Sequence, residues 1–166
     1  YDVEEAAEKA KKEPVWVHFG IGNIFRVFIG GIADGLLEEG ALDRGITCVE
    51  TFDYDVVDKI YKPYDNLGLN VILHGDGKRE YKVLGALAEA VKARSADLEQ
   101  WNRLKEIFTH SSLQMVSFTI TEKGYALHGT DGTWLPYVQA DIEKGPDGAV
   151  GAMAVVTAML YERYKA

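Results

Sequence analysis

The 166-residue sequence has a single cysteine, Cys48, and more acid than base. A lone cysteine excludes a framework of disulfides within the chain, and a reducing cytoplasm is the expected location. The 18 Lys and Arg stand against 26 Asp and Glu, a formal net charge of −8, and no basic cluster suits a nucleic-acid backbone. No apolar run approaches the roughly 20 residues that a membrane-spanning helix needs. We therefore expect no nucleic acid and no membrane among its partners.

Metal-binding patterns are also missing. The four histidines are scattered, there is no paired cysteine, and no H-x-x-x-H spacing occurs. We therefore expect no metal site, and Cys48 is interpreted as a small buried apolar residue.

The composition is that of a globular domain, with 47% hydrophobic and 27% charged residues. The length suits one domain and is short for two. Residues 1–13 are charged throughout and are expected to form a surface helix or a disordered segment, followed by one domain over 14–166. The chain opens with Tyr1 and stops within a helical pattern, "YERYKA", so we expect a part of a longer protein.

The first half alternates strand and helix patterns. "PVWVHF" at 14–19 and "ITCVE" at 46–50 are short apolar runs typical of buried strands. From Gly22 onward, apolar residues recur at helical spacing until Gly40, a predicted C-cap; they are Ile24, Phe28, Ile32 and Leu36. A second helix is predicted after Asp53 or Asp55 and should stop at Pro63. This alternation is typical of a parallel α/β sheet.

The second half is more mixed. "NVILH" and "REYKVLG" flank Asp76-Gly77, which predicts an antiparallel hairpin whose two central residues both have positive φ. A short alanine-rich helix is predicted over 86–93 and a strand over 113–120. Two further helices are predicted, with apolar stripes formed by Leu98, Trp101, Leu104 and Phe108 in the first and by Val150, Met153, Val156, Leu160 and Tyr164 in the last, at 149–165. The expected fold is α/β, a Rossmann-like, doubly wound and mostly parallel sheet with an antiparallel β-hairpin insertion.

A glycine loop lies between the first strand and the first helix. Gly20 permits a tight turn, Gly22 removes a Cβ that would hold a pyrophosphate away, and the helix that follows directs N–H groups at the phosphates. The third glycine of the dinucleotide fingerprint is replaced by Phe25, and Gly30 or Gly31 is expected to allow close packing instead. The predicted cofactor-binding residues here are Gly20, Ile21, Gly22, Asn23, Ile24 and Arg26.

The second strand ends in an acid, Glu50, where the fingerprint places one. A carboxylate there accepts hydrogen bonds from ribose hydroxyls and repels a 2′-phosphate, which favours NAD over NADP. Asp53 is a second candidate, with helix capping as its simpler role. Two alternatives stay open: glycines that merely separate strand from helix, and a methyltransferase, although His18 and Phe19 stand where that class usually has an acid.

The stretches "HFGIGNIFRVFIGG" and "QMVSFTITEKGY" resemble the mannitol dehydrogenase family, which includes polyol-specific long-chain dehydrogenases and fructuronate-tagaturonate reductases. "ETFDYDVVDKIYKPYDNL" and "VTAMLYERYK" are similar to the same family. The resemblance implies a Rossmann domain that binds NAD(H), joined to a helical C-terminal domain that supplies a catalytic lysine. It also implies hydride transfer between nicotinamide and a polyol or sugar acid, of the mannitol/fructose or mannonate/fructuronate type.

That catalytic domain is absent from the sequence, so the chain by itself is expected to bind NAD and to be inactive. A stand-alone NAD(H)-sensing module is the alternative.

Two further groups of residues are candidates for a functional site. Thr119 lies near the end of the strand predicted at 113–120, and Thr121, Glu122 and Lys123 follow it. All four are predicted to line the ribose and nicotinamide, the alternative being a polar turn. Tyr161 and Lys165 have the spacing of the Tyr/Lys pair of short-chain dehydrogenases, but a solvated helix face is the favoured interpretation.

Overall fold

The computed structural model describes residues 1–166 and contains a four-stranded parallel sheet. The strand order is β5-β2-β1-β6, in which β1 spans Trp16–Phe19, β2 Ile46–Glu50, β5 Leu87–Lys92 and β6 Met115–Phe118. The first strand is central, and the chain builds outward from it on one side and then on the other. This change of direction between β1 and β6 is a topological switch point, and doubly wound sheets bind ligands beside such a point, at the carboxyl ends of the strands. The predicted fold class is confirmed.

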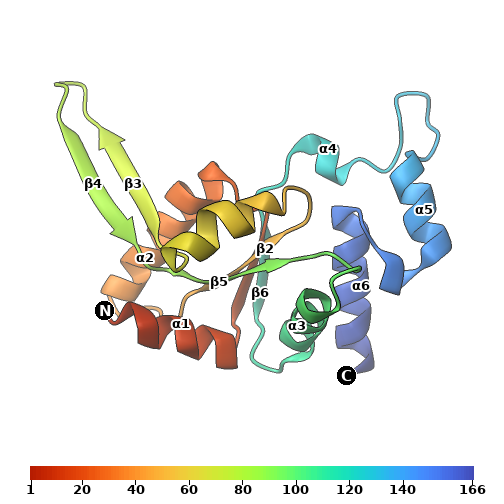
Figure 1. The fold of residues 1–166 in the computed structure, drawn as a ribbon, viewed down its shortest axis with the longest axis horizontal. Helices are drawn as coiled ribbons and strands as arrows, with labels where there is room; N and C mark the ends of the chain where they lie inside the picture. Colours follow the sequence, from red (N-terminus) through yellow and green to blue (C-terminus); the bar gives the residue numbers. More distant parts are fainter.

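Helices cover both faces of the sheet (Figure 1). On one face α3 (Leu98–Thr109) and α6 (Ala152–Lys165) enclose an apolar core with Val17 and Phe19 of β1. On the other face lie a π-helical turn, η1 (Phe25–Ile29), that continues into α2 (Gly30–Glu38), and a second π-helical turn, η2 (Val57–Tyr61), that ends in the 3-10 turn η3 (Lys62–Tyr64). The remaining helices are α4 (Glu122–Tyr125), α5 (Pro136–Lys144) and the 3-10 turn η4 (Pro146–Gly148).

The predicted hairpin forms β3 (Gly68–Leu73) and β4 (Arg79–Leu84), which project from the body of the molecule (Figure 1). Its turn differs from the prediction, because only Gly77 has a positive φ, +85°, and Asp76 does not. His74 accepts a hydrogen bond from Gly77 N at 3.0 Å, and His74 N donates to Lys78 at 2.9 Å. This is the three-residue connection, with glycine in the left-handed position, rather than the two-residue one.

The helix predicted over 86–93 is wrong, since this segment is strand β5, paired in parallel with β2. Alanine favours a helix in isolation, but pairing and burial on the sheet override that preference. Small side chains suit close packing of α1 (Val3–Lys12) against this strand: Ala86 and Ala88 are buried, as are Ala6 and Ala10 of α1, whereas Ala93 belongs to the core on the α3 side.

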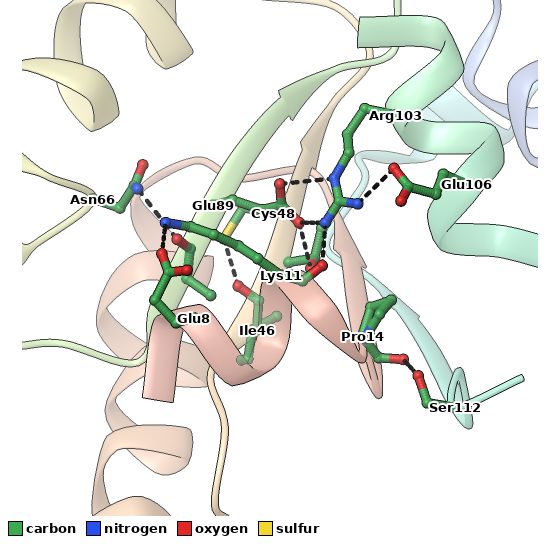
Figure 2. A network of polar contacts seen from close by, with 12 residues as sticks. Glu8, Lys11, Pro14, Ile46, Cys48, Asn66, Glu89, Arg103, Glu106 and Ser112 are labelled. Atoms are coloured by element: carbon green, nitrogen blue, oxygen red, sulfur yellow. Dashed lines mark hydrogen bonds and ion pairs between the residues drawn. The ribbon is translucent and has the colours of Figure 1, made fainter. Parts of the chain in front are cut away.

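One arginine ties α1 and α3 to the sheet (Figure 2). The Arg103 guanidinium on α3 forms two hydrogen bonds with the Glu89 carboxylate on β5, at 2.7 and 3.1 Å. It also donates to the carbonyl of Lys11 at 2.7 Å, near the end of α1. The paired, planar geometry is the stronger kind of ion pair and is largely shielded from solvent. Residues 3–12 are therefore an integral layer of the fold, and the boundary predicted at residue 14 stays a prediction.

Two predicted apolar stripes are mostly exposed, and other residues of the same helices supply most of the buried side. In the first helix Ile24, Phe28 and Ile32 are exposed, whereas the buried residues are Phe25, Ala33 and Leu37. The last helix begins at Ala152 and buries Val155, Ala158 and Met159, while Val150, Leu160 and Tyr164 are exposed. Both helices have apolar residues on more than one side, and periodicity alone does not select the side that packs.

Other predictions differ in detail. Leu98 is exposed at the start of α3, although Trp101, Leu104 and Phe108 are buried as expected. Gly40 follows Glu39, the C-cap residue of α2, in the left-handed conformation with φ +73°, so the helix ends where the glycine predicted it to end. The strand predicted over 113–120 is limited to Met115–Phe118. None of the helices combines the length and the apolar character needed to span a bilayer.

Candidate functional site

Gly20 makes the turn that leaves β1 at the carboxyl end of the sheet. Its φ is +86°, and a Cβ at this position would lie 2.5 Å from the carbonyl oxygen of Thr119, which follows β6. Both the conformation and the space exclude any side chain. The backbones that leave β1 and β6 thus lie too close together at this point for a side chain on residue 20.

Gly22 differs from Gly20, because it is exposed and a Cβ there would meet nothing within 4 Å. The first hydrogen bond of the helix joins Arg26 N to Gly22 O at 3.1 Å. The N–H groups that precede Arg26 in this first turn therefore have no acceptor within the helix. Open space in front of free N–H groups is the arrangement that binds a phosphate.

The carbonyl of Ile21, in the glycine loop, accepts two side-chain hydrogen bonds. Tyr61 donates its hydroxyl to this oxygen at 2.9 Å, and Arg26 donates to it at 3.4 Å. The Arg26 guanidinium also donates to Asn23 Oδ1 and lies 5.8 Å from the centre of the Tyr61 ring. Burial raises the pKa of Tyr61, so its hydroxyl stays protonated and continues to donate. The predicted Asn23 and Arg26 thus lie together at the start of the helix, and Tyr61 is a supporting residue that the sequence did not reveal.

Glu50 is buried at the end of β2, and its carboxylate holds three backbone N–H groups. Oε1 accepts from Thr51 and Phe52 at 2.9 and 3.0 Å, and Oε2 accepts from Ile21 at a longer 3.5 Å. A carboxylate has about four acceptor positions, so one remains, on Oε2. The acid and the glycine loop, 29 residues apart in sequence, are therefore in direct contact.

A chain of side chains connects β1 with β6 beneath the loop. Ser117 Oγ accepts from Trp16 Nε1 at 2.7 Å and lies 2.7 Å from Nδ1 of His18. Nε2 of His18 lies 2.9 Å from Thr119 Oγ1, which donates to Gly20 O at 2.6 Å. His18 stacks on Phe25 with a ring separation of 4.1 Å, and burial lowers its pKa to about 4. The imidazole is therefore neutral at pH 7.

Three predicted residues do not make contact with this group. Thr121, Glu122 and Lys123 are exposed at the start of α4, beyond the carboxyl end of β6, and no side-chain hydrogen bond joins them to the glycine loop. Phe52, two residues after Glu50, is the most exposed of the large apolar side chains, with 91% of its surface accessible. Phe52 was not among the predicted site residues, although its position two residues after the acid was a usable signal.

The remaining candidates lie apart from the hydrogen bonds described above. Neither Asp53 nor Asp55 caps the helix at 55–61 with its side chain. Lys165 pairs with Glu162 at 2.9 Å on an exposed face of α6, in agreement with a solvated helix face. Cys48 is fully buried, which raises the pKa of its thiol. A small cavity of about 30 Å³ between α5 and α6 has room for about one water molecule and not for a cofactor.

The strand order and the glycine turn define a Rossmann-type domain. Comparison with known proteins makes this more specific. D-mannonate oxidoreductase from Thermotoga maritima is 46% identical over all 166 residues, which is 31% of that relative. The uncharacterized oxidoreductase YeiQ from Escherichia coli is 28% identical over 116 residues, 70% of this chain and 23% of the relative.

Solved structures agree with this result. A D-sorbitol dehydrogenase in substrate-free form has 29% identity and a TM-score of 0.77, over 99% of this chain and 33% of that one. Pseudomonas fluorescens mannitol 2-dehydrogenase, solved with NAD and D-mannitol, has 22% identity and a TM-score of 0.79, over 99% of this chain and 32% of that one. No family model matches the chain. The predicted resemblance to the mannitol dehydrogenase family is confirmed, and the matched part is about a quarter to a third of the length of these proteins.

Proposed function

We propose that this chain is the NAD-binding part of an oxidoreductase that transfers a hydride between nicotinamide and a polyol or sugar acid. The observation that carries the proposal is the open space in front of Gly22, beyond the carboxyl end of β1 at the switch point of the sheet and beside free helical N–H groups. The oxidoreductase and dehydrogenase relatives support it. No observation favours a sensor module or a methyltransferase.

The cofactor's pyrophosphate is proposed to lie against Gly20, Ile21, Gly22, Asn23, Ile24 and Arg26. Ile21 contributes through its backbone, because its side chain is buried, whereas Ile24 is exposed on the outer side of the first turn. Arg26 is held by Asn23 and by the carbonyl of Ile21, so its charge is fixed near the helix start with part of its surface accessible. A fixed guanidinium complements a phosphate better than a mobile one does.

Glu50 is proposed to bind the adenosine ribose. Three backbone N–H groups fix its carboxylate, and one acceptor position on Oε2 is left for a ribose hydroxyl. A 2′-phosphate would meet a buried negative charge, so NAD should bind in preference to NADP. Phe52, exposed beside this position, is proposed to contact the adenine.

Thr121, Glu122 and Lys123 are proposed to flank the nicotinamide, because they follow β6, the strand beside β1 on the side away from β2. When bound, the cofactor would supply the hydride acceptor or donor. The polyol or sugar-acid substrate, a role in carbohydrate metabolism and a lysine-bearing catalytic domain in the longer protein are proposals drawn from the relatives. The predicted cytoplasmic location and the absence of nucleic-acid partners stay predictions.

The proposal is tested by titrating NAD into the 166-residue chain and into Gly22→Ala. The added methyl group occupies the space assigned to the pyrophosphate, so the Kd for NAD should rise at least about tenfold, which corresponds to 1.4 kcal/mol. The unfolding free energy should not fall, because the methyl group meets nothing and φ is not positive.

Gly31→Ala is the matched control, since Gly31 lies on the same helix and a Cβ there also meets nothing within 4 Å. This variant should bind NAD as the unchanged protein does. NADP should bind the unchanged protein at least about tenfold more weakly than NAD. Unaltered NAD binding by Gly22→Ala would refute the placement of the pyrophosphate, and equal affinity for the two cofactors would refute the role of Glu50.

A further inference from the structure

We infer that His18 is a positioning residue, held as the neutral Nε2–H tautomer in a one-directional hydrogen-bond chain that fixes the Gly20–Ile21 peptide. The inference rests on the proposed function, because this peptide is the one proposed to face the pyrophosphate. The chain runs from Trp16 through Ser117, His18 and Thr119 to the carbonyl of Gly20.

The direction of the chain follows from its first member. An indole N–H can only donate, so Ser117 Oγ accepts from Trp16 at 2.7 Å. The hydroxyl hydrogen of Ser117 is then free to point at Nδ1 of His18, its other neighbour at 2.7 Å. Nδ1 is therefore the acceptor, and the single proton of the neutral ring lies on Nε2.

The last member leads to the same assignment independently. A carbonyl oxygen can only accept, so Thr119 donates its hydroxyl hydrogen to Gly20 O at 2.6 Å. Thr119 Oγ1 must then accept from Nε2 of His18, 2.9 Å away, and Nε2 must carry the proton. Both ends thus require one tautomer, and every hydrogen along the chain has an acceptor.

The hydrogen-bond chain ends at the Gly20–Ile21 peptide and fixes its orientation. The Gly20 carbonyl is held by Thr119, while the N–H of the same peptide, on Ile21, points to Oε2 of Glu50 at 3.5 Å. The plane of the peptide that opens the glycine loop is therefore fixed from β6 on one side and from β2 on the other. Stacking of His18 on Phe25, the residue one turn into the helix, joins the same chain to the helix that follows.

The tautomer is tested by nitrogen NMR on the 166-residue chain with 15N-labelled histidine, where protonated and unprotonated ring nitrogens resonate far apart. The signals of His18 are assigned by their loss in His18→Gln. A pattern with protonated Nε2 and unprotonated Nδ1 is expected at pH 7, and it requires no cofactor. A protonated Nδ1, or a mixture of tautomers, would overturn the assignment even if NAD binds as proposed.

The positioning role is tested by NAD titration of two Thr119 variants. Thr119→Val removes the hydroxyl and keeps the side-chain volume, and it should raise the Kd for NAD about tenfold. Thr119→Ser restores the hydroxyl and should restore the affinity to within about twofold. Thr109→Val is the control, because the Thr109 hydroxyl bonds only to carbonyls of its own helix.

Failures of the two proposals are distinguishable. If the unchanged protein does not bind NAD, the proposed function fails and the NMR result still decides the tautomer. If the unchanged protein binds NAD and Thr119→Val binds equally well, the positioning role is refuted and the cofactor assignment stands. Loss of binding in both Thr119→Val and Thr119→Ser would also refute the role of the hydroxyl.

Discussion

The carboxyl end of the sheet and the tip of the hairpin use the same backbone conformation in opposite surroundings. Gly20 has φ +86° and Gly77 has φ +85°. A Cβ on Gly20 would collide with the backbone of Thr119 at 2.5 Å, whereas a Cβ on Gly77 would meet nothing within 4 Å. A left-handed glycine by itself therefore indicates only a turn. The close approach of a second strand is what distinguishes the glycine of the site.

The largest effect on stability is expected when each of the two glycines is replaced by alanine. Gly20→Ala adds a backbone clash to the strain of a positive φ and should lower the unfolding free energy by at least about 4 kcal/mol. Gly77→Ala has the strain alone and should cost about 1 kcal/mol. Urea denaturation of both variants checks the difference. Equal losses of unfolding free energy would show that the ends of β1 and β6 can move apart without cost.

A smaller effect depends on pH and concerns His18. Burial lowers its pKa from 6.5 to about 4, although a backbone contact with Gly20 acts in the opposite direction. The unfolded chain therefore binds a proton at a higher pH than the folded chain does, and stability falls as the pH drops from about 6.5 to about 4. The contribution of this one group is about 3 kcal/mol, present in full above pH 6.5 and lost below pH 4.

Urea denaturation at pH 7 and at pH 4.5 measures this contribution, with His18→Gln as the reference. The variant should lose distinctly less stability on acidification than the unchanged protein. The same dependence in both proteins would mean that the imidazole is not shielded from water as the structure shows.

The smallest effect is expected on the hairpin. Leu73 is 72% exposed at the end of β3, so Leu73→Thr should change the unfolding free energy by no more than about 0.5 kcal/mol. Leu104→Ala, at a fully buried position on α3, gives the contrast and should cost about 2 to 5 kcal/mol. Thermal unfolding monitored by circular dichroism compares the two. A large loss at Leu73 would indicate that the hairpin packs against something in solution.

Much of the fold was predictable because strong local signals agreed with the tertiary structure. The buried strands at β1 and β2, the hairpin and the α3 helix were all indicated by their residue patterns. The helix predicted over the β5 segment was wrong because alanine favours a helix locally. The strand forms through pairing with β2 and packing against α1, which the local sequence does not show. The apolar stripes on α2 and α6 were predicted wrongly for a different reason. A helix with apolar residues on several sides gives no indication of which side packs against the sheet.

The site was predictable in part for similar reasons. Gly20, Gly22 and Glu50 occupy positions with a known spacing, and the structure brings the loop and the acid into contact. The chain through His18 was not predictable, because it joins residues about 100 positions apart whose only signal is a polar side chain in a buried strand. Tyr61 was missed for the same reason, since its partner is a backbone carbonyl 40 residues away.

The π-helical turn at Phe25–Ile29 affects how this chain is aligned with others. A hydrogen bond from Gly30 N to Phe25 O spans five residues instead of four, so this turn carries one residue more than an ordinary turn. Gly30 is buried and faces Leu87, where a Cβ would be 3.4 Å from the leucine side chain, so a glycine for close packing occurs well after the position held by Phe25. Against a protein whose corresponding helix is α-helical throughout, this turn counts as a one-residue insertion, and an alignment without a gap there would shift every following residue of the helix by one position.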